Sequence, residues 1–242
     1  MLRKVLLAGA AGLVLAGAAA PAGAQSAPTA TASPAAWQDG LFGVRQDSRK
    51  GKVSVRLPAP GADGVLGRYL YQPGLSAGLG MDGAGLDRSG LGQAQIVVFR
   101  QVGDRVFAAF ENHRFRAVDA DPDQVNAVAA SFVSPVVWSG EVAETGADGS
   151  VTVDLSGFLE RDAVNAVGRL KRAKLGSFKP APNLGYVDVA ETLVFPDNVE
   201  FQTVQTFTSD EPGGELSRVS PETRSVTLAV RHSFIRLPDD GF

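Results

Sequence analysis

The sequence has 242 residues, which is enough for one large domain or two small ones with a buried core. Its 44% apolar and 20% charged residues are typical of a globular protein, and a formal charge of −3 without a long basic run argues against a nucleic-acid-binding protein. Cysteine is absent, which excludes disulfides, thiolate metal sites and a cysteine nucleophile.

Residues 1–24 have the organisation of a signal peptide. Met1-Leu2-Arg3-Lys4 is a cationic start, an apolar run follows from Val5 to Ala20, and Ala22-Gly23-Ala24 supplies the small residues that precede a cleavage site. The apolar run is shorter than the roughly 20 residues that a membrane-spanning helix needs. We therefore expect a protein exported to the periplasm or the medium, with no membrane span after cleavage.

Residues 25–36 form a tract of Ser, Thr, Ala and Pro without charge or large apolar side chains (QSAPTATASPAA). Such a composition cannot pack, so we expect a flexible linker. The ordered domain is then expected to begin near Trp37 and to occupy residues 37–242.

Beyond Trp37, short runs of alternating apolar and polar residues bounded by Gly, Asp and Pro predict strands. The predicted strands cover 52–57, 67–71, 94–99, 105–111, 136–142, 150–155, 185–194, 200–207 and 225–237. Gly103-Asp104 predicts a hairpin between the third and fourth of these, and residues 146–149 predict another between the fifth and sixth.

Two segments have helical spacing of apolar residues. The first, residues 122–132, has Asp121 as an N-cap and Pro122 at its first position. The second, residues 158–174, ends in basic residues that suit a helix C-terminus. The expected fold is mainly β (α+β), with antiparallel sheets in hairpins and meanders and about two inserted helices.

A G-x-S-x-G motif spans Gly74 to Gly78 and holds Ser76. The nucleophile elbow of a hydrolase needs a helix directly after this motif, and the residues that follow are too rich in glycine to form one. A hydrolase using Ser76 and His232 is therefore the weakest of the functional alternatives. We assign no catalytic, cofactor-binding or metal-binding residue in this chain, and we favour a hydrogen-bonded structural role for both His113 and His232.

The order of several short motifs carries a family resemblance. These are Gly40-Leu41-Phe42, Gly78-Leu79-Gly80, Gly85-Leu86-Asp87-Arg88-x-Gly90-Leu91-Gly92, Ser134-Pro135-Val136-Val137-Trp138, Leu159-x-Arg161-Asp162-Ala163, Asn198-Val199-Glu200 and the run 232–241. In this order, over Asp39 to Phe242, they resemble the N-terminal domain of unknown function of large exported bacterial zinc-dependent metalloproteases.

The resemblance implies a non-catalytic domain that packs against or gates a downstream peptidase domain. Zinc and the His-Glu-x-x-His motif would belong to that domain, so we expect this chain to be truncated before it. The implied partners are the peptidase domain of the same polypeptide and a peptide substrate. The signature residues with an expected structural role are Gly85, Leu86, Asp87, Arg88, Gly90, Trp138, Arg161, Asp162, Asn198 and Glu200.

Within this signature, the glycines suit a tight loop, and Asp87 or Arg88 is expected to pin the loop through a charge-assisted hydrogen bond. An alternative function stays open. The chain would then be a free-standing exported module that binds a glycan or a peptide on an exposed sheet face.

Overall fold

The fold is that of a computed structural model, which describes residues 36–238 except 82, 116 and 119. The expected signal peptide, residues 1–24, and all but the last residue of the expected linker, residues 25–36, lie outside the described residues. Of the expected domain 37–242, the last four residues also lie outside them.

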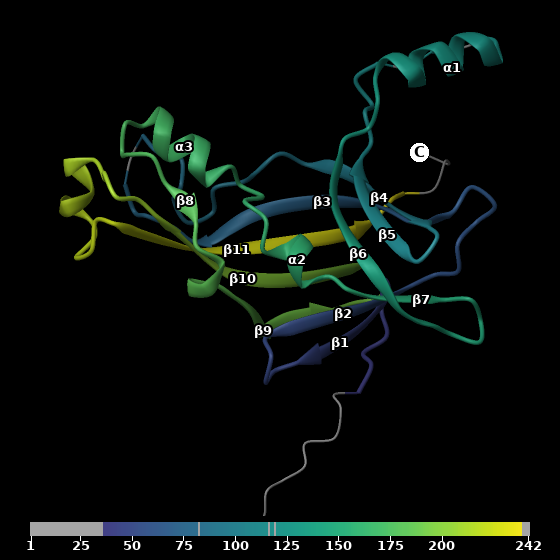
Figure 1. The fold of residues 1–242 in the computed structure, drawn as a ribbon, viewed down its shortest axis with the longest axis horizontal. Helices are drawn as coiled ribbons and strands as arrows, with labels where there is room; N and C mark the ends of the chain where they lie inside the picture. The colour runs from purple at the N-terminus through teal and green to yellow at the C-terminus, as the bar shows by residue number, and fades with distance from the viewer. Residues whose placement is uncertain (1–35, 82, 116, 119, 239–242) are drawn as a thin grey trace, which may run out of the picture. The chain divides into compact units, whose positions relative to one another are not determined.

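The described chain is mainly β, as its residue patterns predict (Figure 1). Its strands are β1 (Gly43–Asp47), β2 (Lys52–Leu57), β3 (Val65–Ala77), β4 (Gln95–Val102), β5 (Arg105–Phe110), β6 (Val136–Thr145), β7 (Val151–Asp154), β8 (Lys179–Pro180), β9 (Tyr186–Val194), β10 (Asn198–Thr208) and β11 (Ser225–Arg236). Its helices are α1 (Pro122–Ser131), α2 (Ser156–Leu159) and α3 (Ala166–Arg172), with 3-10 turns η1 (Pro182–Leu184) and η2 (Gly214–Arg218).

Eleven strands of the described residues form one antiparallel sheet in the order β1-β2-β7-β6-β5-β4-β3-β11-β10-β8, and β9 also pairs with β10. Both predicted hairpins are confirmed, because β4 pairs with β5 and β6 pairs with β7. In the first hairpin Val102 lies opposite Arg105, and Gly103 takes the positive φ of 57° that the tight turn requires.

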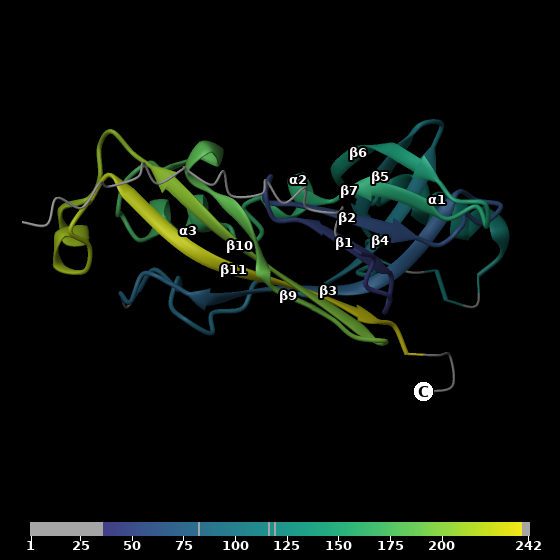
Figure 2. The same cartoon turned by 90° about the horizontal axis from the view of Figure 1, so that it is seen from below.

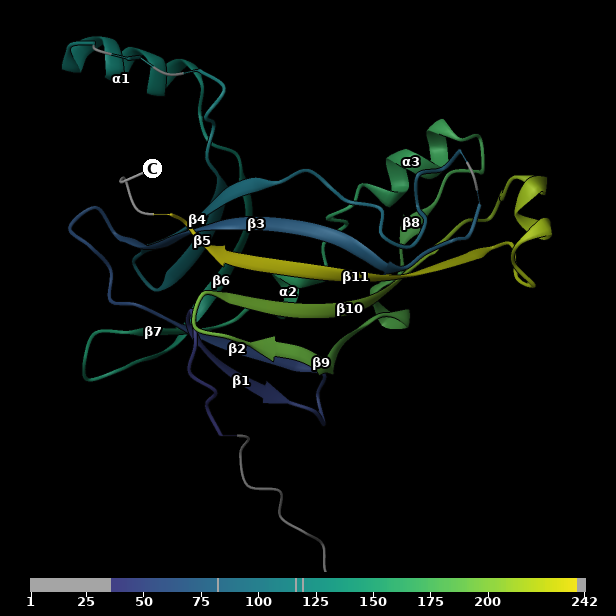
Figure 3. The ribbon, with the colours of Figure 1, turned by 180° about the vertical axis from the view of Figure 1, so that it is seen from behind.

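The sheet curls until its two ends meet. Figures 1 and 3 show β1, β2 and β9 side by side, although β1 is at one end of the strand order and β9 is near the other. The Leu41 amide donates to the Phe195 carbonyl at 2.8 Å across this seam. Gly40 permits the approach, because a Cβ there would lie 2.6 Å from the same carbonyl oxygen.

The curled sheet encloses two hydrophobic clusters. Cluster A lies within the curl and is rich in aromatic residues, among them Phe42, Tyr69, Tyr71, Phe99, Phe158, Phe201 and Phe234. Cluster B lies under α3 and η2 and is mainly aliphatic, with Leu75, Leu86, Leu170, Leu216, Val226, Leu228 and Val230 among its members. The long strands β3, β10 and β11 each contribute side chains to both clusters. Figure 2 shows the course of these strands from below.

The helix expected over residues 158–174 is wrong as one element, because α2 and α3 are separate. Asn165 takes a left-handed conformation, with φ 54° and ψ 45°, which ends any continuous helix at this point. The Asp162 carboxylate then accepts hydrogen bonds from the Ala166 and Val167 amides at 2.6 and 3.0 Å and starts α3.

The first expected helix is present as α1. The Asp121 carboxylate accepts from the Gln124 amide at 2.9 Å, which confirms the predicted N-cap. However, α1 buries none of its residues, and it stands clear of the sheet in Figures 1 and 3. Within the described residues, no helix combines the length and the apolar character that crossing a membrane requires.

Candidate functional site

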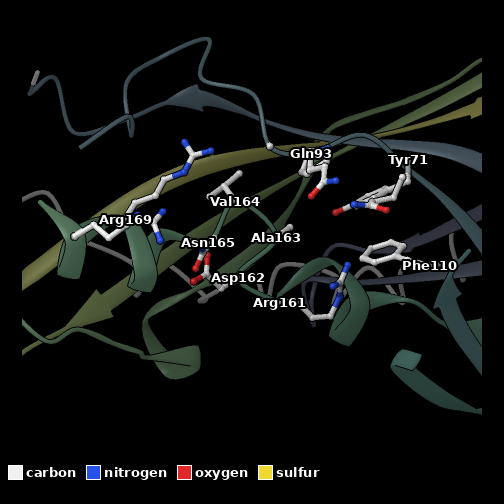
Figure 4. Close-up of a pocket in the computed structure, with 13 residues that line it drawn as sticks. Tyr71, Gln93, Phe110, Arg161, Asp162, Ala163, Val164, Asn165 and Arg169 are labelled. Carbon is white, nitrogen blue, oxygen red and sulfur yellow. The ribbon is translucent and has the colours of Figure 1, made fainter. Parts of the chain in front are cut away.

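A cavity of about 370 Å³ lies beside the segment that joins α2 to α3, and we call it the α2–α3 cavity. Its walls come from β3, the start of β4, the end of β5, the joining segment and α3 (Figure 4). The lining residues are Tyr71, Pro73, Gly92, Gln93, Gln95, Phe110, Arg161, Asp162, Ala163, Val164, Asn165, Arg169 and Arg172. The volume is at the small end of the roughly 300–1,000 Å³ range of small-molecule sites.

Arg161 forms the floor of this cavity. Its guanidinium lies 4.0 Å from the centre of the Phe158 ring and 5.5 Å from that of Phe110, and its Nε donates to the Phe158 carbonyl at 2.9 Å. Figure 4 shows the guanidinium pointing towards the rings of Phe110 and Tyr71. Burial lowers the pKa of Arg161 from its usual value, while the neighbouring Tyr71 opposes that shift.

A buried hydrogen-bonded chain begins beside this guanidinium. Burial raises the pKa of Tyr71, whose ring lies beside Arg161 and whose hydroxyl is hydrogen-bonded to His232 Nδ1 at 2.7 Å. The other ring nitrogen of His232, Nε2, is hydrogen-bonded to Thr203 Oγ1 at 3.1 Å. Burial, followed by the charge of Arg161, lowers the pKa of His232 to about 3, so the ring is neutral.

Gln205 extends the same chain. Its side-chain amide donates to Thr203 Oγ1 at 3.1 Å and to the carbonyls of Leu159 and Arg161 at 3.0 and 2.9 Å. These polar residues separate the two hydrophobic clusters. Along β11, for example, Val230 belongs to cluster B and Phe234 to cluster A, with His232 between them. The polar layer therefore runs between the two cores and opens at the α2–α3 cavity.

The glycine-rich loop of residues 85–92 ends beside the site, where Gly92 lines the α2–α3 cavity. Its backbone pairs with β3, because Leu75 exchanges hydrogen bonds of 2.8 Å with Ser89 and Gly90, and the Gly92 amide donates to the Pro73 carbonyl at 2.9 Å. Gly78 is required for this pairing, since a Cβ there would overlap the backbone of Leu86 and Asp87. Gly85 contributes a positive φ of 65°.

The residue that pins this loop differs from the expectation for Asp87 or Arg88. Arg169 on α3 donates to the carbonyl of Gly85, and its second nitrogen donates to that of Leu91 at 3.1 Å. Arg88 instead lines a separate hollow on the outer side of β3. Leu86 is fully buried in cluster B, so the loop is held by packing as well as by Arg169.

The other signature residues lie in different places. Trp138 on β6 packs edge-on against Phe158, with ring centres 6.2 Å apart. Asn198 and Glu200 are on β10, where Glu200 accepts from Ser233 Oγ at 2.5 Å and from Asn198 at 3.2 Å. Only Arg161 and Asp162 of the signature line the α2–α3 cavity.

Ser76 and His232 are not arranged as a nucleophile and its base. Ser76 Oγ donates to Gln202 Oε1 at 2.7 Å, whereas both ring nitrogens of His232 are engaged by Tyr71 and Thr203. His113, the other histidine, lies 3.0 Å from a Glu111 oxygen. Within the described residues, no three His, Asp or Glu side chains gather as a metal-binding group would require.

The cavity is suited to holding an anion, because its lining has three basic residues and one acidic residue. The basic residues are Arg161, Arg169 and Arg172, and the acidic one is Asp162. The sequence singled out Arg161 and Asp162 only as signature residues with a structural role, and it did not identify Tyr71, Gln95 or Arg172 as site residues. These residues come from four separate stretches of the chain, so no local spacing could have joined them.

A comparison with protein families finds that the model described as a domain of unknown function (DUF5117) matches residues 89–242. The matched range begins inside the glycine loop, so it includes Gly90, Trp138, Arg161, Asp162, Asn198 and Glu200 and leaves out residues 85–88. Neither the curated proteins nor the solved structures contain a match.

Proposed function

We propose a function for this chain from the premise that it belongs to the DUF5117 family, a domain of unknown function whose model matches residues 89–242. The proposed function is that of a non-catalytic accessory domain of an exported zinc-dependent metalloprotease. It would pack against or gate a peptidase domain that follows it in the same polypeptide. The motif order from Gly40 to Gly241 supports this assignment through the resemblance that it carries.

The structural observation that carries the proposal is the α1 arm, which we define as the described residues between β5 and β6. Apolar side chains are exposed along this arm, namely Phe115, Val118, Val125, Phe132 and Val133. Val118 and Val133 are 75% and 72% exposed, and the rings of Phe115 and Phe132 stack with centres 3.9 Å apart. Exposed apolar groups that gather in this way mark interaction surfaces.

A helix without buried residues is also weak on its own. The ten residues of α1 fall below the length at which an isolated helix is stable in water, so its stability depends on packing. We propose that the peptidase domain supplies this packing and covers the apolar face of α1 when the two are joined.

The first test is to read the source gene beyond the codon for Phe242. The proposal expects a continuous frame that reaches a His-Glu-x-x-His segment. Amide exchange is then compared between this chain and the longer polypeptide, and the amides of α1 are expected to exchange at least about tenfold more slowly in the longer one. An immediate stop codon, or equal exchange in the two proteins, would contradict the proposal.

A matched pair of variants locates the contact. Val125→Asp in α1 places a charge in the proposed interface and is expected to remove the protection of α1 in the longer polypeptide. Val219→Asp is the control. Val219 is exposed to a similar extent, 40% against 47% for Val125, and it lies outside the α1 arm. Equal protection in both variants would place the contact elsewhere.

The α2–α3 cavity favours a second candidate function, that of an exported module that binds a glycan or a peptide. Its support is a concave site in which charged and amide side chains converge on two aromatic rings. This candidate needs no downstream domain. Saturable binding of a glycan or a peptide by this chain alone would favour it. No binding across a broad panel of such ligands would count against it.

A further inference from the structure

We propose that the α2–α3 cavity binds the carboxylate of a peptide, with Arg161 as the residue that receives it. This inference rests on the second candidate function, the binding module, and names its ligand chemistry. It does not depend on what the α1 arm contacts.

The hydrogen bonding of Arg161 is incomplete. Its Nε donates to the Phe158 carbonyl, but its Nη2 is buried and has no hydrogen-bond partner among the described residues. A buried guanidinium N–H without an acceptor is costly, and such groups in proteins are normally satisfied. The cavity lies directly against this residue, so an acceptor bound there would complete its hydrogen bonds.

The charge of the cavity favours an anion as that acceptor. Three guanidinium groups line the cavity, and both oxygens of the Asp162 carboxylate are already used by the Ala166 and Val167 amides at the start of α3. Arg169 is a positioning residue, since it is bonded to the glycine loop. Arg172 is exposed and has no ion pair within the described residues, so its charge is available to an incoming anion.

The remaining lining favours a planar carboxylate on a peptide over a free inorganic anion. The rings of Tyr71 and Phe110 stack with centres 5.8 Å apart and give the cavity an apolar wall. The side-chain amides of Gln93, Gln95 and Asn165 offer both donors and acceptors, which match the groups of a peptide backbone. A planar carboxylate also matches the fork of a guanidinium group, which can donate two parallel hydrogen bonds to it.

The cavity also has an exit for a longer chain. Gln93 and Gln95 are shared with a second, open hollow of about 600 Å³ that continues along Ile96 and residues 111–114. A peptide too long for the α2–α3 cavity would continue into this second hollow. The Arg114 and His113 side chains at its far wall add further polar contacts.

The test is calorimetric titration of the chain with N-acetyl-Ala-Phe, which has a free terminal carboxylate, and with the same dipeptide as its amide. The acid is expected to bind at least about tenfold more tightly, since one charge-assisted pair accounts for a difference of that size. N-acetyl-Glu amide distinguishes a side-chain carboxylate from a terminal one, and binding of either acid supports the proposal. Galacturonate tests a glycan acid in place of a peptide.

Variants assign the binding to the arginines. Arg161→Gln is expected to abolish the preference for the acid over the amide, with thermal melting used to show that the variant is folded. Arg172→Gln tests the same charge at an exposed position, where folding is not at risk, and is expected to weaken acid binding about threefold to tenfold. Arg218→Gln is the control, because Arg218 is exposed on η2 and does not line the cavity.

The outcomes are separable. Equal binding of acid and amide overturns the carboxylate assignment and leaves the binding-module function standing. Binding of galacturonate alone overturns the assignment to a peptide. If no probe binds at millimolar concentration, the proposed site is wrong and the binding module loses its support, whereas the accessory-domain proposal is still decided by the exchange of α1.

Discussion

His232 lies between two hydrophobic clusters, where an imidazole is stable only in its neutral form. The groups that act on the ring come from β3, β10 and the α2–α3 segment. They are the Tyr71 hydroxyl, the Thr203 hydroxyl and the charged Arg161 guanidinium. Burial and this charge hold its pKa at about 3. In the unfolded chain the ring would titrate near its ordinary value of about 6.5.

This difference makes the stability of the fold depend on pH. Between about pH 6.5 and pH 3 the unfolded chain binds one proton more at this residue than the folded chain does, so the free energy of unfolding is expected to fall as pH decreases through that window. The contribution approaches ~1.4 kcal/mol per pH unit. Urea denaturation at several pH values measures the slope for the wild type and for His232→Gln, which should lose this part of it.

The control for that series is His113→Gln, which changes the half-exposed histidine beside Glu111 and leaves the buried one in place. It should retain the slope that His232 causes. Equal slopes in the wild type and His232→Gln would show that the ring is not held neutral by burial.

At the scale of elements, α3 both covers cluster B and holds the glycine loop in place. Arg169 reaches from this helix to two carbonyls of the glycine loop and holds the loop against β3. The loop is otherwise held by its backbone pairing with β3 and by Leu86, which is fully buried. One arginine on a helix therefore fixes a segment that lies about eighty residues earlier in the chain.

Arg169→Gln is expected to loosen this loop. The shorter, neutral side chain cannot satisfy both carbonyls, so the variant should lose about 1–3 kcal/mol of stability. The amides of Ser89 and Gly92, which bond to β3, should exchange several-fold faster. Arg172→Gln on the same helix is the control, and if both variants exchange alike, Arg169 does not pin the loop.

At the scale of the whole molecule, the curl of the sheet brings its first strands against β9. The seam has few backbone hydrogen bonds in the described residues, and that between Leu41 and Phe195 is one of them. Exposed strand edges are prone to pair with other chains. Closing the curl therefore protects both edges as well as enclosing cluster A.

Gly40→Ala tests this closure. The added methyl group would meet the Phe195 carbonyl and the Val194 side chain at 2.6 Å, so the seam must open or shift. We expect a loss of about 1–3 kcal/mol, as for overpacking, with faster amide exchange in both β1 and β9. Gly214→Ala is the control, because a Cβ there meets no atom within 4 Å. A Gly40→Ala protein as stable as the wild type would show that the seam tolerates the extra atom.

The sequence by itself determined the elements whose signals are local. Alternating side chains located most strands, Gly103 located the tight hairpin turn, and Asp121 located the start of α1. It did not locate the break at Asn165, because helical spacing of apolar residues continues across it while the Asp162 carboxylate starts a new helix. It also did not show that the apolar stripe of α1 would be left without cover.

Only the tertiary structure decided which residues meet. The residues that line the α2–α3 cavity come from segments far apart in the chain. The curled sheet brings these segments together by pairing strands that are distant in sequence. The same curl put His232 between two cores and gave it a partner on β3 and another on β10. Periodicity reports the face of a strand that each side chain occupies, but the choice of neighbouring strand depends on the energy of the whole sheet.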